Sequence, residues 1–376
     1  MNPVYNPLFQ PFTFRSGLQV HNRMVMAPMT NWSSEPDGSV SDAELRYYER
    51  RSGQVGMVIT ACVYVTPSGK GFHGEFAADR DEMIPSLRQL AETIKEQGSK
   101  AILQIYHGGR ECPAELLPDG DVVSAGNVPS SQNPSVIPRA LTHEEIVSII
   151  KDFGEATRRA IEAGYDGVEI HGANGYLFQQ FFSPHTNNRN DQWGGDLTKR
   201  MAFPLAVVDE VKREVEEHSN GAFAVGYRFS PEEAESPGIT MSDTLALVEA
   251  LVTRDLDYLH ISLLDFWSHP RSGEELHRSR IEIVNEKIDG RVPLIGVGSI
   301  RTAEEALKAY ETGIPLIALG RALIIDPDWV QKVQEGKEAD IVLSLSKDAQ
   351  ESLAIPDPMW SRIMNSRPGW FPIASN

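Results

Sequence analysis

Eight short apolar runs, each continuous rather than alternating with polar residues, restrict the fold of this chain more than any other feature. They are Met24–Met29, Met57–Val65, Ala101–Tyr106, Gly167–His171, Ala224–Phe229, Tyr258–Leu263, Val292–Val297 and Leu316–Leu319. Strands with this pattern are typical of a parallel sheet that is covered on both faces. Longer amphipathic stretches separate the runs. Eight strands with a helical segment after most of them predict an α/β fold of the (β/α)8 TIM-barrel type.

The stretches between the runs carry the start and stop signals of helices. In THEEIVSIIKDFGEATRRAIEAG, Thr142 is placed as the N-cap, Glu145 as its capping-box partner and Gly164 as the terminator. The segment Thr302–Gly313 repeats the same order of residues. Both patterns predict helices that connect consecutive strands.

The chain has 376 residues, whereas a barrel of this type usually needs about 250. The stretch FTFRSGLQVHN, ahead of the first strand, predicts a hairpin with a Ser-Gly turn that plugs the barrel floor. Three long polar insertions, 108–139, 183–199 and 265–280, follow predicted strands at the face where barrel enzymes place their active sites. We expect one domain over 1–376, with the barrel at about 22–340 and a C-terminal extension over 341–376.

A doubly wound sheet is the alternative architecture for alternating strands and helices. It would be expected to carry a glycine-rich GxGxxG turn after its first strand. The residues at that place read APMTNWSS, which does not match the pattern. The barrel is therefore the favoured fold.

Composition excludes several classes of function. The net charge of −18 disfavours a nucleic-acid surface. The two cysteines, Cys62 and Cys112, are too few for a disulfide framework and lack the spacing of a zinc or cluster site. No apolar run has the length of a membrane span, and the first residues lack the layout of a signal peptide. We expect a cytoplasmic protein that binds neither membrane nor nucleic acid.

Two of the predicted strand ends indicate a phosphate site. The seventh and eighth strands end in GVGS (296–299) and GRA (320–322), small residues whose backbone N–H groups can approach an anion. Each precedes a predicted helix whose N-terminus favours negative charge, and Arg321 adds a cation. In barrel enzymes, the phosphate site is frequently found at these two strand ends.

The other strand ends lack the groups that most barrel chemistries need. No lysine is placed there for a Schiff base, and no carboxylate pair for glycoside cleavage. His107 and His171 have no carboxylate beside them that would complete a metal site, so we expect no metal. The remaining groups are neutral hydrogen-bonding side chains, one cation and one phenol, which suit the binding of a cofactor that carries the chemistry.

Several motifs, in the same order along the chain, resemble the old yellow enzyme family of FMN-dependent ene-reductases. They are APMT, GQVGMVIT, LQIYHGGR, EIHGANGYLFQQFFSPHTNNRNDQWGG, the arginine of the fifth strand and ALGR. The resemblance extends over about 6–329, and its long central block is highly specific. It implies a TIM barrel with FMN at the mouth formed by the carboxyl ends of the strands, and NADH or NADPH as the electron donor.

The resemblance also implies which residues bind the flavin. They are Ala27, Pro28, Met29, Thr30, Cys62, Gln104, Arg228, Gly298, Gly320 and Arg321. The first four would lie along the ring, with the Thr30 hydroxyl near the flavin carbonyl beside N5, and Cys62 would flank the ring. Gln104 would pair with the pyrimidine edge, and Arg228 would lie near N1. Gly298, Gly320 and Arg321 would hold the phosphate.

Three further residues are implied to act on the substrate. His171 and Asn174 would bind its carbonyl or nitro group, and Tyr176 would donate a proton. The implied activity is reduction of activated alkenes by hydride from reduced flavin N5. Two alternatives stay open: an FMN oxidase or dehydrogenase that uses another donor or acceptor (a quinone, a nitro compound, oxygen or free flavin), and a flavin-binding redox sensor without catalysis.

The sequence differs from the family pattern, or adds to it, at two places. Trp32 occurs where relatives often have a smaller residue, so we expect a narrower substrate pocket. Larger relatives carry an iron–sulfur cluster and a second flavin domain, whereas here we expect FMN to be the only redox centre. The aromatic tail SRPGWF (Ser366–Phe371) predicts either docking on its own barrel or, as a minor hypothesis, an arm that reaches the active site of a neighbouring subunit. The expected partners are a small electrophilic substrate and a nicotinamide, and a homo-oligomer stays open.

Overall fold

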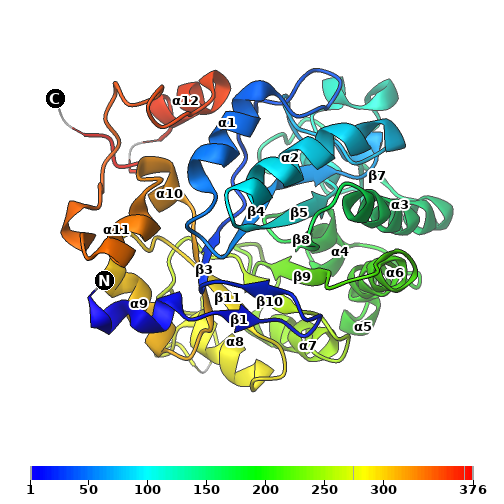
Figure 1. Cartoon of the computed structure of the whole chain (residues 1–376). Helices are drawn as coiled ribbons and strands as arrows, with labels where there is room; N and C mark the ends of the chain where they lie inside the picture. The colour runs from blue at the N-terminus through cyan, green and yellow to red at the C-terminus, as the bar shows by residue number, and fades with distance from the viewer. Residues whose placement is uncertain (1, 274, 368, 375–376) are drawn as a thin grey trace.

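The computed structural model describes residues 2–273, 275–367 and 369–374 (Figure 1). Eight parallel strands close a barrel in the order β3-β4-β5-β8-β9-β10-β11-β12, with β12 pairing back to β3. They are β3 (Met24–Met26), β4 (Met57–Tyr64), β5 (Lys100–Tyr106), β8 (Gly167–Gly172), β9 (Ala224–Phe229), β10 (Tyr258–Ile261), β11 (Leu294–Val297) and β12 (Leu316–Leu319). The predicted (β/α)8 barrel is confirmed.

Four strands are shorter than their apolar runs, β4 by one residue and three others by two or three. β3 ends at Met26 rather than Met29, close to Pro28, which has no N–H to donate to a ladder. β11 begins at Leu294, directly after Pro293, for the same reason. β10 ends at Ile261, two residues before the predicted end.

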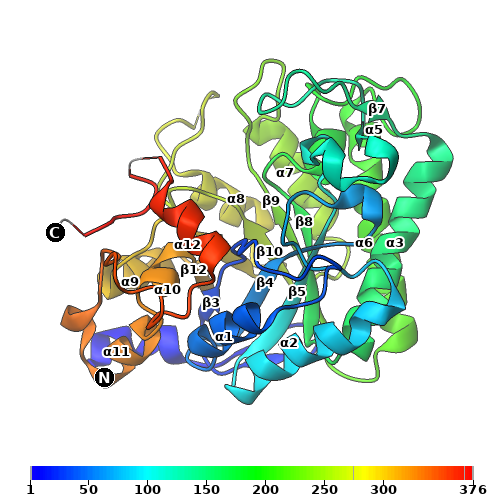
Figure 2. The same cartoon turned by 90° about the horizontal axis from the view of Figure 1, so that it is seen from above.

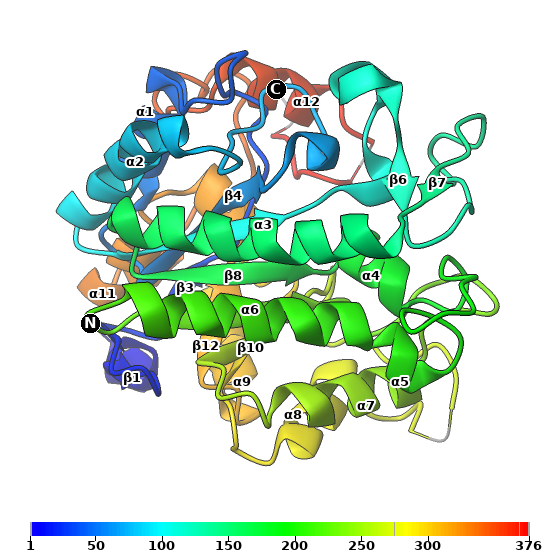
Figure 3. The same cartoon turned by 90° about the vertical axis from the view of Figure 1, so that its right-hand side faces the viewer.

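An outer ring of helices covers the barrel. The helices are α1 (Asp42–Arg51), α2 (Ile84–Glu96), α3 (His143–Glu162), α4 (Leu177–Phe182), α5 (Leu197–Arg200), α6 (Ala202–His218), α7 (Met241–Leu251), α8 (Arg280–Ile288), α9 (Ala303–Glu311), α10 (Arg321–Ile325), α11 (Trp329–Glu335) and α12 (Asp357–Met364). Figure 3 shows α3 and α6 side by side over β8. The predicted capping boxes of Thr142 and Thr302 are both present.

The hairpin before the first barrel strand plugs one end of the barrel, as predicted. Its strands are β1 (Phe12–Thr13) and β2 (Gln19–Val20), and its turn uses Gly17 at φ +87°. Phe14 and Leu18 are buried in a cluster with side chains from the barrel interior, such as Tyr258. Figure 1 shows the dark blue hairpin across the barrel.

The C-terminal segment after α11 folds back toward the mouth of the barrel. It contains α12, and Leu345 pairs with Ile373 near its end. Figure 2 shows α12 beside β12 and α10. Within the described part of the chain, no helix combines the length and the apolar character that crossing a bilayer requires.

Candidate active site

A cavity of about 820 Å³ opens at the carboxyl ends of the barrel strands. That volume lies within the range of pockets that bind drug-sized ligands and cofactors. Ten of the predicted site residues line it: Ala27, Pro28, Met29, Thr30, Trp32, Asn174, Arg228, Gly298, Gly320 and Arg321. The structure therefore brings both ends of the predicted flavin site to one cavity.

Four predicted residues lie next to the cavity instead of in its lining: Cys62, Gln104, His171 and Tyr176. The strand register fixes the places of the first three, and Tyr176 precedes α4. Cys62 pairs with Gln104 across β4 and β5, and His171 pairs with Arg228 across β8 and β9. Because Arg228 lines the cavity, His171 lies beside its wall.

The end of the cavity near β11 and β12 has the features of a phosphate cradle. Gly298 has φ +147°, and a Cβ added there would lie 2.2 Å from the backbone nitrogen of Phe266, so only glycine fits this close approach. Arg321 donates one hydrogen bond to Ser299 Oγ (2.6 Å) and another to the carbonyl oxygen of Trp370 (2.6 Å). A cation and small residues at two helix starts suit an anionic group.

Arg228 supplies a cation at the other end of the cavity. Arg228 is only 8% exposed, and its Nε has no hydrogen-bond partner among the described residues. Burial lowers the pKa of this guanidinium. A buried donor without a partner calls for an acceptor, and the electron-rich ring edge of FMN offers one. The cavity thus fits FMN. Arg321 is the cation at the end that suits the phosphate, and Arg228 is the cation at the end that suits the ring.

His171 is a buried, neutral hydrogen-bond donor. It is 2% exposed, and its Nδ1 accepts a hydrogen bond from the backbone N–H of Ala173 (3.3 Å). Burial, followed by the charges of Arg228 and His260, holds the pKa of His171 well below its ordinary value. A neutral imidazole whose Nδ1 accepts must carry its proton on Nε2.

Asn174 is held in a left-handed conformation, φ +60°, which asparagine tolerates better than most residues. Its backbone N–H donates to Ser230 Oγ (2.9 Å) and its Oδ1 accepts from Ser262 Oγ (2.9 Å). With Oδ1 engaged, the Nδ2 amide group is the part of the side chain left to donate to a ligand in the cavity.

Tyr176 begins α4 as its N-cap, but its side chain makes no capping hydrogen bond. Its ring packs edge-on against His171 (centroids 5.1 Å apart) and against Tyr106 (4.9 Å). Burial raises the pKa of the phenol far above its ordinary value, so Tyr176 is protonated at neutral pH. A protonated phenol therefore lies beside the His171 imidazole.

Trp32 forms part of the cavity wall at φ +54°. Its ring packs against Phe72, with centroids 6.3 Å apart, and the guanidinium of Arg362 lies 4.6 Å from its centroid. The sequence did not indicate that α12 takes part in the cavity, which Met359, Arg362 and Ile363 also line. The aromatic tail was the only signal in that region.

The described part of that tail lies on its own chain. Trp370 and Phe371 line the cavity, and Trp370 stacks beneath Arg321 with 5.0 Å between Cζ and the ring centroid. Pro368, which belongs to the predicted tail motif, lies outside the described residues. The tail thus contributes to the end of the cavity that contains Arg321.

The two cysteines and His107 are buried, and none of them lines the cavity. Cys62 is 5% and Cys112 3% exposed, and burial raises the pKa of both thiols well above the ordinary value. His107 Nδ1 accepts from the N–H of Gly109 (3.0 Å), and its Nε2 lies 3.2 Å from Ser68 Oγ. These contacts tie together the loops that follow β4 and β5.

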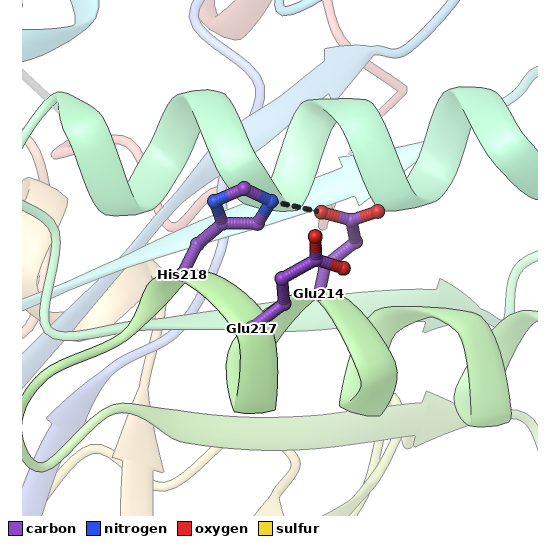
Figure 4. A group of neighbouring side chains, drawn as sticks. All are labelled: Glu214, Glu217 and His218. Carbon is purple, nitrogen blue, oxygen red and sulfur yellow. Dashed lines mark ion pairs between the residues drawn. The ribbon is translucent and has the colours of Figure 1, made fainter.

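A separate group of two glutamates and a histidine, none of which lines the cavity, lies near the end of α6 (Figure 4). Ligand atoms of Glu214, Glu217 and His218 lie within 4.8 Å of one another. Arg213 forms ion pairs with both glutamates, and His218 Nε2 is 3.1 Å from Glu214 Oε2. These contacts account for the cluster, and we assign no metal to it.

The sequence of residues 7–340 matches the NADH:flavin oxidoreductase / NADH oxidase family. A probable NADH-dependent flavin oxidoreductase, YqiG, of Bacillus subtilis (strain 168) is 55% identical, and the alignment covers 99% of each chain. An NADPH dehydrogenase of the same organism is 32% identical, with 89% of this chain and 96% of the relative covered. The NADH:fumarate oxidoreductase of Klebsiella pneumoniae (strain 342) is 41% identical over 94% of this chain, but only 38% of that longer protein is covered.

The fold is also similar to that of solved structures. Morphinone reductase in complex with tetrahydroNAD superposes with a TM-score of 0.78 and 26% sequence identity, over 98% of both chains. A second structure of morphinone reductase gives a TM-score of 0.75 and 27% identity, over 88% of this chain and 89% of the other.

Proposed function

Because this chain belongs to the NADH:flavin oxidoreductase / NADH oxidase family and is an NADH-dependent FMN oxidoreductase of the old yellow enzyme type, we propose that it reduces activated alkenes such as α,β-unsaturated carbonyl compounds. The observation that carries the proposal is the placement of a neutral imidazole and a protonated phenol together beside the cavity wall. The rings of His171 and Tyr176 are 5.1 Å apart. His171 also pairs in register with Arg228, the proposed contact of the flavin ring.

The residues proposed to hold FMN follow from the two ends of the cavity. Gly298, Gly320 and Arg321 would hold the phosphate, and Arg228 and Gln104 would bind the ring edge. Bound there, FMN would supply the chemistry of hydride transfer between NADH and the alkene. The segment from Ala27 to Thr30, which lines the cavity, would lie along the ring.

His171 and Asn174 would bind the carbonyl oxygen of the substrate. His171 offers Nε2–H because its Nδ1 is engaged by Ala173, and Asn174 offers Nδ2–H because its Oδ1 is engaged by Ser262. As hydride adds to the β-carbon, negative charge develops on that oxygen. One such preorganised donor changes a rate by about 100- to 1000-fold.

Tyr176 would supply the proton. Its phenol is kept protonated by burial, which raises its pKa, and it can donate to the α-carbon as the enolate collapses. The proton then comes back to Tyr176 from solvent. The net reaction takes one hydride, from NADH, and one proton, and it leaves a saturated carbonyl compound and NAD⁺.

An anaerobic experiment tests the proposal. The purified protein is reconstituted with FMN, reduced with one equivalent of NADH, and mixed with 2-cyclohexenone, a quinone or oxygen in separate runs. We expect bleaching of the flavin by NADH and then reoxidation by the enone, with cyclohexanone as the product. Reoxidation by quinone or oxygen without any reduction of the enone would overturn the proposal and favour an oxidase.

A further inference from the structure

A buried polar network lies in the barrel beside the cavity, centred on the carboxylate of Glu169. Glu169 is on β8 and is 0% exposed. Its Oε1 accepts a hydrogen bond from Gln104 Nε2 (2.7 Å), and its Oε2 lies 2.9 Å from Nδ1 of His260. The three residues come from β5, β8 and β10, so the closed barrel is what brings them together.

The network decides which atom Gln104 can offer to a ligand. An ionised carboxylate only accepts hydrogen bonds, so the amide nitrogen of Gln104, and not its oxygen, must face Glu169. Gln104 Oε1 is then the acceptor left for a group at the mouth. The adjacent register of Gln104 and Glu169 in β5 and β8 holds the pair in place.

Glu169 is also a negative charge that acts on Arg228, the cation proposed for the flavin ring: its charge raises the pKa of that guanidinium, against the effect of burial, which lowers it. Burial raises the pKa of its carboxyl group, but the opposing effects of His260, Arg228 and Gln104 outweigh burial and hold that pKa below the ordinary value. Arg228 pairs in register with His260 on β10. A buried anion and a buried cation therefore share this layer of the barrel, where a low dielectric strengthens their interaction.

We propose that Glu169 is a positioning residue of the flavin site, which fixes the Gln104 amide with its oxygen toward the mouth and offsets the charge of Arg228. The proposal rests on the roles given above to Gln104 and Arg228. A ligand edge that matches this arrangement offers an N–H to Gln104 and an electron-rich atom to Arg228. The imide edge of a flavin has both groups.

The charge effect is tested with Glu169→Gln, which keeps the size of the side chain and its ability to accept from Gln104. Without the negative charge, Arg228 stabilises the reduced, anionic flavin more strongly. We expect a more positive midpoint potential of bound FMN in spectroelectrochemical titration, with an affinity for FMN within about threefold of the wild type. Glu214→Gln, which removes another buried carboxylate on α6, is the matched control and should leave the potential unchanged.

The orientation effect is tested with Glu169→Leu, which removes the acceptor altogether. Gln104 is then free to turn its amide, and we expect the dissociation constant of FMN, measured by fluorescence titration of the apoprotein, to rise by about tenfold, the effect of one lost hydrogen bond. If Glu169 acts through Gln104, the double variant Glu169→Leu/Gln104→Leu should bind FMN no more weakly than Gln104→Leu alone.

Two results would overturn the proposal. The first is a midpoint potential of bound FMN in Glu169→Gln that equals the wild-type value or is more negative. The second is a dissociation constant of FMN in the double variant that rises by the product of the two single effects. Thermal unfolding of each apoprotein shows whether it is folded, and the isosteric glutamine variant carries the test if the leucine variant does not fold. Neither readout needs an alkene, so a failure to reduce enones would remove the proposed substrate class and leave this inference standing.

Discussion

At the scale of single residues, the proposed roles of His171 and Tyr176 depend on protonation states that burial sets. Both groups are kept neutral, since burial lowers the pKa of the imidazole and raises the pKa of the phenol. A neutral pair can donate hydrogen bonds and a proton over the whole physiological pH range. Titration of either group should therefore not limit the enzyme near neutral pH.

We expect Tyr176→Phe to slow the reduction of enones by about 100- to 10,000-fold, the usual contribution of a positioned general acid. Reduction of the bound flavin by NADH should keep its wild-type rate, because that half-reaction needs no proton from the phenol. Rapid mixing under anaerobic conditions measures the two half-reactions separately. Tyr106→Phe, which alters the neighbouring buried phenol, is the control, and a full rate in Tyr176→Phe with slow substrates would refute the assignment.

His107 makes the stability of the fold depend on pH. Burial lowers the pKa of its imidazole to about 3, whereas an unfolded chain has a value near ~6.5. Between these pH values the unfolded state binds more protons than the folded state. The contribution of neutral His107 to the stability of the fold is therefore present above about pH 6.5 and is lost as pH falls toward 3.

The expected slope of the free energy of unfolding is up to about 1.4 kcal/mol per pH unit in this window. His107→Gln should flatten the slope, whereas His73→Gln, in an exposed loop, should leave it unchanged. Urea unfolding at a series of pH values between 4 and 7 measures it. An identical slope in the wild type and in His107→Gln would show that other groups control acid unfolding.

At the scale of elements, the strands and helix starts were predictable because their signals are local. Continuous apolar runs marked all eight barrel strands, and Thr142 with Glu145 marked the start of α3. The contact of Gln104 with Glu169 was not predictable, since 65 residues separate the pair along the chain. His260 is buried on β10, and its Nε2 has no hydrogen-bond partner among the described residues.

The hairpin plug gives a prediction for one element. Phe14 is 3% exposed and fills the barrel floor together with Leu18 and Val20. We expect Phe14→Ala to lower the free energy of unfolding by about 3–5 kcal/mol, as is usual when a buried phenylalanine is truncated. Phe12→Ala, at a partly buried position of the same hairpin, should cost less.

The affinity for FMN separates stability from function in this variant. The plug and the cavity lie at opposite ends of the barrel, so Phe14→Ala should bind FMN with nearly wild-type affinity at a temperature where it is folded. Chemical unfolding and fluorescence titration of the same preparation measure both quantities. A large loss of FMN affinity in the folded variant would mean that packing at the barrel floor affects the geometry of the FMN site at the other end.

At the scale of the whole molecule, residues far apart in the sequence close one cavity. The strands supply its floor, and the C-terminal segment supplies Val342, Leu343 and the stretch from Trp370 to Pro372. Arg321 joins the two parts through the carbonyl oxygen of Trp370. Binding at the phosphate end should therefore be coupled to the stability of this segment.

We expect FMN to slow proteolysis of the C-terminal segment, where Val342 and Leu343 are 46% and 47% exposed. A ligand that binds only the folded state stabilises it by about 2.7 kcal/mol at a concentration of 100 times its dissociation constant, and the segment lines its cavity. Cleavage in the exposed loop 127–138, which contributes no lining residue, is the internal control and should change less. Mass spectrometry of fragments from limited digestion, with and without FMN, locates the cuts. Equal protection of both regions would indicate that FMN stabilises the barrel as a whole, without a specific link through Arg321 and Trp370.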